Sequence, residues 1–232
     1  MDDQDPEWPT ARPFVPVSRK VATMRRAASS CRGCPLYRDA TQTVFGQGAV
    51  PAVLMLIGEQ PGDQEDRQGL PFVGPAGDVL ARALEAAGIA RDTVYVTNVV
   101  KHFKWEPRGK RRIHKTPRIS EIKACLPWTE SEIEAVHPRV IVCLGATAAR
   151  ALLGSAFRIT QSRGRVFPRP GAAAIVATWH PSAVLRAYDD AAQARQLFEH
   201  LTDDLRSAAR YAGRRGRDKS RTGREEKGHR TT

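Results

Sequence analysis

The sequence has no run of eighteen apolar residues, which is about the length that a helix needs to cross a membrane. Residues 1–8 are polar and acidic, and they lack the basic-then-apolar order of a secretory signal. The chain also has no internal repeat and no feature that indicates an oligomer. These absences exclude a membrane-spanning helix, and we expect a cytoplasmic monomer.

Two common nucleotide-binding motifs are missing as well. The turn Gly58-Glu59-Gln60-Pro61-Gly62-Asp63 is not followed by the Gly-Lys-Ser/Thr of a Walker loop, and it is not a G-x-G-x-x-G fingerprint. Its two glycines and its proline fix a tight turn, in which backbone amides can approach a ligand. An ordinary strand-to-loop turn with a solvated Glu59 fits the same residues equally well.

Cysteine is scarce, and this limits its possible roles. The four cysteines are Cys31, Cys34, Cys125 and Cys143. A cytoplasmic protein rarely keeps disulfides, so the Cys31-x-x-Cys34 pair is interpreted first as half of a metal site. Such a site needs two further ligands from elsewhere in the chain.

Positive charge is concentrated in two segments. The formal net charge is +12, and residues 101–118 and 206–232 carry +7 each, which leaves −2 for the rest of the chain. This distribution favours a polyanionic partner such as nucleic acid. The first segment interleaves Phe103 and Trp105 with its cations, which strengthens that interpretation. The tail fits a solubilising, disordered extension equally well.

The pattern of apolar residues predicts an α/β domain. Buried parallel strands are expected where short apolar runs end in a polar or glycine residue, over 53–58, 94–100, 139–145 and 173–178. Helices are expected over 74–88, 119–136, 146–153 and 191–211, and an irregular loop over 101–117. This alternation predicts a three-layer sandwich: a central, mostly parallel four-stranded sheet flanked by helices. We expect a domain over residues 21–211, a flexible extension over 1–20 and a basic disordered tail over 212–232.

Polar residues follow several of these strands. Glu59 and Gln60 come after the first strand, Asn98 ends the second, and His180 follows the fourth. Parallel sheets bind ligands at the carboxyl ends of their strands, so one shared site is predicted there. Each residue also has a simpler interpretation, for example Asn98 as a turn residue.

Three residues of this site each have a possible functional role. His180 could donate a hydrogen bond to a developing anion, or it could be incidental beside a helix-capping Ser182. Asn98 offers both a donor and an acceptor to a pyrimidine edge. Phe72 could stack on a base, although a lone phenylalanine in such a segment usually belongs to the core.

Several motifs together resemble the uracil-DNA glycosylase superfamily. They are GEQPG, GLPFVGPAG, YVTNVVKHFK, the KRRIHK loop, IVCLG and WHPS, within about residues 25–210. The resemblance is greatest to the iron–sulfur members of family 4 and, near them, to the UdgX-type proteins. Gln60 in place of the usual Ala, and the KRRIH loop, point to UdgX.

The resemblance implies a role for each matching residue. Phe72 would stack on an extruded uracil, Asn98 would bind its edge, and His180 would stabilise the leaving uracil anion. Glu59 would stabilise the sugar cation or orient His114, and Gln60 would shape the pocket. Four further residues would contact the substrate through their backbone or side chains, namely Gly58, Gly62, Asp63 and Ser182.

His114 is the most unusual of the implied residues. It would capture C1′ of the deoxyribose and leave the protein covalently attached to the abasic DNA, because a neutral imidazole held close to the cation is a better nucleophile than water. The DNA-binding cations of this loop would be Lys110, Arg111, Arg112 and Lys115. A merely solvated basic loop is the alternative.

The resemblance also implies a metal centre. Family 4 places a cysteine where this chain has His102, so the matching ligands are Cys31, Cys34, His102 and Cys125. A [4Fe–4S] cluster is implied, with a structural role, whereas the spacing alone would also suit zinc. Cys143 lies inside a strand and is expected to be a core thiol.

The resemblance therefore implies a uracil-DNA glycosylase, and we expect it in the bacterial cytoplasm, associated with the nucleoid. It would act on uracil-containing DNA, single-stranded by preference, and be trapped through His114 after one turnover. A conventional, turning-over glycosylase is one alternative. A non-catalytic uracil-DNA-binding module is the other, although pure binding needs no donor for a developing anion.

Overall fold

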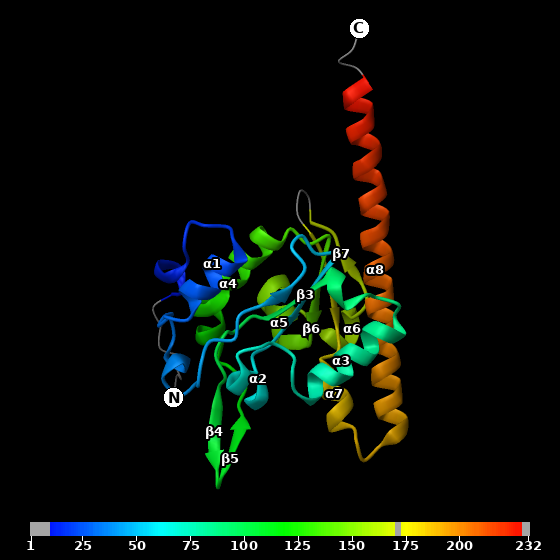
Figure 1. The fold of residues 1–232 in the computed structure, drawn as a ribbon. Helices are drawn as coiled ribbons and strands as arrows, with labels where there is room; N and C mark the ends of the chain where they lie inside the picture. Colours follow the sequence, from blue (N-terminus) through cyan, green and yellow to red (C-terminus); the bar gives the residue numbers. More distant parts are fainter. Residues whose placement is uncertain (1–9, 170–172, 229–232) are drawn as a thin grey trace.

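The structure is a computed structural model that describes residues 10–169 and 173–228, with side chains described as far as residue 214. Its centre is a sheet with helices packed on both faces (Figure 1). Residues 1–9 of the expected flexible extension and residues 229–232 of the expected tail lie outside the described part. No helix in the described part is both long and apolar enough to span a bilayer.

Four parallel strands form the middle of the sheet. In spatial order they are β3 (Val94–Asn98), β2 (Leu54–Gly58), β6 (Val140–Leu144) and β8 (Ala174–Thr178). Every residue of the four is buried. Continuous burial explains why they are uninterrupted apolar runs in the sequence, since both faces of the sheet are covered. The expected α/β architecture is confirmed, and each strand matches its predicted range to within two residues at either end.

The sheet has six strands, not the four expected. β1 (Gln47–Gly48) pairs antiparallel with β3, and β7 (Val166–Phe167) pairs antiparallel with β8. Each extra strand is two residues long and lies at an edge. A two-residue strand is too short to show an alternation of apolar and polar residues, so neither strand was predicted.

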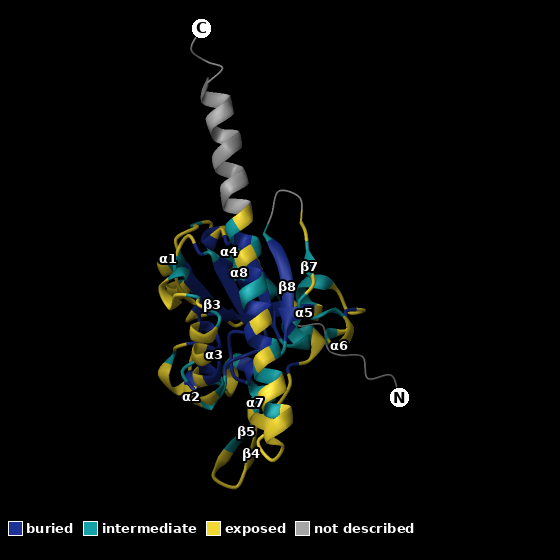
Figure 2. Cartoon of the chain, turned by 90° about the vertical axis from the view of Figure 1, so that its right-hand side faces the viewer, coloured by how far each residue is buried: buried dark blue, intermediate teal, exposed yellow. Residues whose placement is uncertain are grey.

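Two helical layers bury the two faces of the sheet (Figure 2). Met55 and Ile57 of β2 face one core, which includes residues of α1 (Val21–Ala28), α4 (Ile119–Val136) and α5 (Ala146–Leu153). Leu54 and Leu56 face the other core, which includes residues of α3 (Pro75–Ala86) and α8 (Ala191–Gly228). Successive side chains of a strand point to opposite faces, and this alternation builds the three layers.

The loop expected over 101–117 contains a β-hairpin. β4 (Trp105–Arg108) pairs antiparallel with β5 (Arg111–His114), and the register places Trp105 opposite His114. Gly109 has φ +59° at the first position of the two-residue turn, as a tight hairpin turn of type II′ requires. The expectation of an irregular loop was therefore wrong. The charged side chains and Pro107 are tolerated in this hairpin because both of its strands are edge strands.

The remaining short elements connect these layers. They are η1 (Arg12–Phe14), η2 (Pro35–Arg38), α2 (Asp63–Gln68), η3 (Arg91–Thr93), α6 (Ile159–Ser162) and α7 (Pro181–Arg186). The helix expected to end at Tyr211 continues to Gly228. Residues 212–228 contain no proline and many arginine, lysine and glutamate residues, which are good helix formers.

Candidate active site

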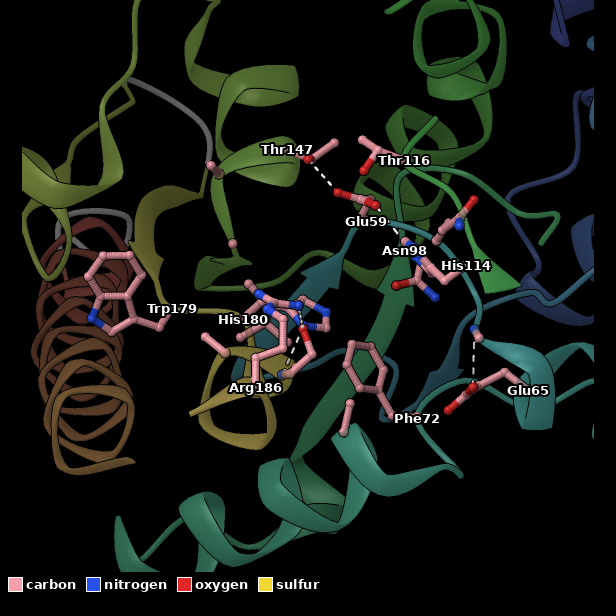
Figure 3. A pocket seen from close by; sticks show the side chains of 18 of the residues that line it. Glu59, Glu65, Phe72, Asn98, His114, Thr116, Thr147, Trp179, His180 and Arg186 are labelled. Atoms are coloured by element: carbon pink, nitrogen blue, oxygen red, sulfur yellow. Dashed lines mark hydrogen bonds and ion pairs between the residues drawn. The ribbon is translucent and has the colours of Figure 1, made fainter. Parts of the chain in front are cut away.

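A cavity of about 670 Å³ opens where β2, β3, β6 and β8 end (Figure 3). It lies at the carboxyl edge of the parallel sheet, where such folds bind ligands. Eight of the predicted site residues line it, and they are Glu59, Gln60, Gly62, Phe72, Asn98, His114, His180 and Ser182. Sequence reasoning missed other lining residues, among them Glu65, Thr116, Thr147, Trp179 and Arg186.

The carboxylate of Glu59 has a different neighbour at each oxygen. The hydroxyl of Thr147 donates a hydrogen bond to Oε2 at 2.5 Å. Nε2 of His114 lies 3.6 Å from Oε1, which is too long for a hydrogen bond. Glu59 follows β2 directly, whereas His114 ends β5 of the hairpin. The fold thus brings a carboxylate and an imidazole from distant segments into one site.

His114 is held as a neutral imidazole. Partial burial lowers its pKa below 6.5, the nearby guanidinium of Arg186 lowers it further, and the Glu59 carboxylate opposes both effects. Its side chain is 49% exposed, so it can reach a ligand in the cavity. A neutral imidazole has one ring nitrogen with a free lone pair, and that nitrogen can act as a nucleophile.

His180 is oriented by the start of α7. The backbone N–H of Ser182 donates to Nδ1 of His180 at 3.1 Å, so Nδ1 is an acceptor and the ring proton resides on Nε2. Burial lowers the pKa of His180 to about 4, with smaller contributions from Arg186 and His114. His180 is therefore a neutral hydrogen-bond donor at physiological pH. The N-cap of α7 is His180 itself, because its side chain accepts from Ser182, so the interpretation of Ser182 as the cap is wrong. Ser182 instead fixes the tautomer of His180.

Phe72 and Asn98 approach each other across Gly58. A Cβ on Gly58 would lie 2.3 Å from Oδ1 of Asn98 and 2.8 Å from Cζ of Phe72. Gly58 does not line the cavity, and its contribution is the space that a side chain would fill. The backbone of Phe72 has φ +56°, which is uncommon for a bulky residue. The Phe72 ring lies 6.2 Å from that of His180, at 31°.

Asn98 carries a polar atom without a protein partner. Its Oδ1 is buried and accepts no hydrogen bond from the described residues. Buried polar atoms are nearly always paired, and an unpaired acceptor at a cavity wall is suited to a ligand that donates. The cavity is therefore suited to a ligand that places a hydrogen-bond donor at Oδ1 of Asn98.

Glu65 holds two walls of the cavity together. Its carboxylate accepts from the backbone N–H of Gly62 at 3.1 Å and from that of Gly74 at 2.8 Å. The amide of Gly62 is therefore already engaged. The first contact ties the turn after β2, and the second ties the segment that carries Phe72. Neither Glu65 nor α2, the helix that carries it, was predicted from the sequence.

Gln60 fastens the base of the hairpin. Its Nε2 donates to the carbonyl oxygens of Lys104 and Lys115 at 3.1 Å each, and its Oε1 accepts from the N–H of Lys104 at 3.0 Å. Lys104 and Lys115 flank the two strands of the hairpin. The amide of Gln60 thus joins the turn after β2 to both strands that position His114.

Arg112 fastens the middle of the hairpin to α2. Its guanidinium donates to Asp63 at 2.5 Å and to Asp66 at 2.6 Å, and it also donates to the hydroxyl of Thr41. Its side chain is 14% exposed. Asp63 does not line the cavity, because it faces this arginine and Arg67. Arg112 thus has two carboxylate partners, and its expected contact with phosphate stays a prediction.

The other predicted DNA-binding cations lie elsewhere on the hairpin. Lys110 and Arg111 are exposed at its tip. Lys115 forms an ion pair with Glu106 within the hairpin. The tip is therefore the part of the hairpin that can present positive charge to a polyanion.

Cys31, Cys34 and Cys125 are buried and lie near one another. Burial raises the pKa of Cys34 to about 11 and that of Cys125 to about 12, and charge on neighbouring cysteines raises both further. Trp128 donates to Sγ of Cys31, and the N–H of Lys101 donates to Sγ of Cys125, each at 3.3 Å. Donors of this kind commonly surround metal-bound sulfur. Cys143 is buried inside β6, as expected of a core thiol.

His102 has the chemistry of a ligand. It is buried, burial lowers its pKa to about 4, and its Nε2 lies 2.9 Å from the hydroxyl of Thr43. In the described part of the chain, no three Cys, His or acidic side chains are grouped as a single ion requires. Three thiols and one imidazole are donors that suit an iron–sulfur cluster and also tetrahedral zinc.

The chain belongs to the uracil DNA glycosylase superfamily, whose sequence profile matches residues 45–206. It is 35% identical to a type-4 uracil-DNA glycosylase of Thermotoga maritima, over 80% of this chain and 91% of that protein. It is 34% identical to a type-4 uracil-DNA glycosylase of Archaeoglobus fulgidus, over 82% and 92% of the two chains. A type-5 uracil-DNA glycosylase of Pyrobaculum aerophilum is 30% identical, over 77% and 83%.

Proposed function

We propose that this protein excises uracil from DNA, preferring single strands, and then stays bound through a covalent bond between His114 and C1′ of the abasic sugar. This is the activity of a UdgX-type protein. The observation that carries the proposal is the position of His114: its Nε2 lies 3.6 Å from Glu59, in the same cavity as Asn98 and His180.

Recognition of uracil rests on Asn98 and Phe72. The unpaired Oδ1 of Asn98 needs a donor, and N3–H of uracil is one. Cytosine carries a lone pair on N3 in place of that hydrogen, so an Oδ1 that faces N3 would be left unsatisfied, at a cost of about 1–3 kcal/mol. The ring of Phe72 offers a stacking surface beside His180. The base must leave its stack to reach these groups, and a single strand makes that easier.

Departure of the base rests on His180. When the C1′–N1 bond breaks, its electron pair stays on uracil and gives an anion. The Nε2–H of the neutral His180 ring can donate to that anion, and such a preorganised donor contributes most in a site that excludes water.

Capture of the sugar rests on Glu59 and His114. The negative carboxylate stabilises the positive charge that develops on the sugar. The lone pair of neutral His114 then forms the N–C1′ bond, and the ring becomes cationic until its remaining proton is lost to solvent. No second step reverses this bond, so the protein would act once.

We propose that the exposed tip residues Lys110 and Arg111 attract the phosphates of the DNA. We also propose that the protein is a cytoplasmic, nucleoid-associated monomer. Residues 21–211 would form the glycosylase domain, with 1–20 and 212–232 as extensions.

A conventional, turning-over glycosylase is the second candidate. It is favoured by the 34–35% identity to two type-4 uracil-DNA glycosylases. In this case water would take the sugar cation, and His114 would only contact DNA.

A denaturing gel separates the two candidates. The protein is mixed with a single-stranded oligonucleotide that contains one deoxyuridine, heated in SDS, and examined for a shifted band. A heat-stable shift that is absent with thymidine supports covalent capture. Alkali-labile abasic sites in excess over protein, without a shift, would establish the conventional enzyme.

The rate of adduct formation should fall in acid with a midpoint below pH 6.5. The nucleophile is the neutral form of His114, and its pKa lies below 6.5. Lowering the pH through that depressed pKa protonates the ring and removes its lone pair, so the rate falls only in more acidic buffer. Single-turnover rates measured from about pH 8 to pH 5 test this. A midpoint above 6.5 would contradict the neutral state assigned to His114.

Replacing Arg112 should slow adduct formation through the position of the hairpin. Arg112→Lys cannot reproduce the paired contacts with Asp63 and Asp66, so we expect a loss of about 10-fold or more in rate. The matched control is Arg111→Lys at the exposed tip. If both variants instead weaken DNA binding equally and with the same salt dependence, Arg112 contacts phosphate and does not position His114.

We also propose that Cys31, Cys34, His102 and Cys125 hold a [4Fe–4S] cluster. When bound, the cluster would cross-link the segments that carry these residues, and glycosidic cleavage needs no electron from it. The purified protein should be yellow-brown, with broad absorbance near about 400 nm. A colourless protein that contains one zinc ion would contradict the cluster.

A further inference from the structure

The turn between β6 and α5 supports two catalytic side chains. Gly145 has φ +92°, and a Cβ built on it would lie 3.0 Å from Cβ of His180. Two residues later, the hydroxyl of Thr147 donates to Oε2 of Glu59 at 2.5 Å. Figure 3 shows Thr147 and His114 on either side of the Glu59 carboxylate. One short segment therefore touches His180 and Glu59.

We propose that Thr147 is a positioning residue that holds Oε2 of Glu59 and thereby directs Oε1 toward His114 and the sugar. This inference rests on the proposed excision of uracil and assigns a role to a residue that no sequence motif singled out. Thr147 does not react. Its effect passes through Glu59.

Glu59 needs such an anchor because its side chain is flexible. Its backbone is fixed, since its carbonyl accepts from the N–H of Val100 at 3.0 Å. Its side chain still has three torsions, and the contact with His114 at 3.6 Å is too long to restrain them. In the described part of the chain, the Thr147 hydroxyl supplies the hydrogen bond that the carboxylate accepts.

Thr147 is itself rigid enough to serve as that anchor. It lies in the first turn of α5, and the β-branch of threonine restricts its χ1 angle in a helix. The next two residues, Ala148 and Ala149, are fully buried in the core. The backbone that carries the hydroxyl is therefore fixed relative to the sheet, and the bond to Glu59 selects among the few rotamers of the side chain. The same turn abuts His180, so it sets the separation between the group facing the base and the group facing the sugar.

The test compares three variants in single-turnover reactions with the deoxyuridine oligonucleotide, following both uracil release and adduct formation. Thr147→Val removes the hydroxyl at nearly constant volume and should slow both rates about 10- to 100-fold, as expected for a lost hydrogen bond to a charged group. Thr147→Ser keeps the hydroxyl and should remain within about 3-fold of the original rates. DNA affinity should be unchanged in both.

A double variant distinguishes a positioning role of Thr147 from a nonspecific disruption of the site. In the Glu59→Gln background, Thr147→Val should cost much less than it does alone, because the two residues act as one unit. Full additivity would overturn the proposal, as would an unchanged rate in Thr147→Val or a slow Thr147→Ser. Melting temperatures of all variants, with Thr147→Ala as a smaller replacement, show whether a loss of rate reflects unfolding.

The outcomes distinguish this inference from the proposed function. If the unmodified protein releases uracil but forms no adduct, covalent capture is wrong, and the release rates still decide the role of Thr147. If the unmodified protein releases no uracil, both proposals are overturned. If it forms the adduct and Thr147→Val does so equally fast, the function stands and the role of Thr147 is wrong.

Discussion

His114→Ala is expected to form no covalent adduct with deoxyuridine-containing DNA, a loss of more than about 1,000-fold, while still releasing uracil. The substitution removes the lone pair proposed to capture C1′. It leaves the carboxylate of Glu59, the unpaired Oδ1 of Asn98 and the donor on His180 in place. Water can enter the space vacated by the half-exposed ring and take the sugar cation instead. The variant should therefore turn over.

The measurement has two parts. Denaturing gels report the adduct, and abasic sites counted over several equivalents of substrate report turnover. His200→Ala is the matched control, because His200 lies on α8 outside the cavity. The proposed separation of capture from cleavage fails if His114→Ala releases no uracil. Covalent capture by His114 fails if the variant still forms a heat-stable adduct.

Glu59→Gln is expected to slow both uracil release and adduct formation by about 10²- to 10³-fold, while DNA still binds. Removing one preorganised electrostatic contact to a transition state has an effect of this size. The amide is nearly the same shape and can still accept the hydrogen bond from Thr147, so the change removes charge more than geometry. The sugar cation then forms without its negative neighbour.

A second glutamate provides the control for this charge change. Glu106 lies on the hairpin but does not line the cavity, so Glu106→Gln should keep wild-type rates in the same single-turnover assay. Wild-type crosslinking by Glu59→Gln would remove Glu59 from the mechanism. The two main variants differ in kind, because His114 acts after the glycosidic bond breaks and Glu59 acts while it breaks.

The regular part of the fold was predictable because burial leaves a direct mark on sequence. The runs around Leu54–Gly58 and Val140–Leu144 are apolar without interruption, since helices cover both faces of the sheet. Parallel strands end at one edge, and the convergence of Glu59, Asn98 and His180 follows from that rule. The two-residue edge strands and the hairpin escaped prediction because neither produces a distinctive period of apolar residues.

The arginines of the hairpin show that charge alone does not predict the partner of each side chain. Arg111 and Arg112 are adjacent and chemically identical, yet Arg111 is exposed at the tip, whereas Arg112 is held by Asp63 and Asp66. Charge counts indicate an affinity for polyanions, but the partner of each arginine depends on which segments fold beside it. Similarly, Gln60 was expected to shape the pocket, and its amide hydrogen-bonds the base of the hairpin.

By itself, the sequence determined the layered α/β fold, the superfamily and the edge of the sheet where the site lies, because periodicity and short motifs are local properties of the chain. Only the tertiary structure decided which side chains meet there. Thr147 lies 88 positions from Glu59, and Arg112 lies 49 positions from Asp63. Contacts of that separation are set by how the helices pack on the sheet, and a sequence pattern that spans a few residues carries no record of them.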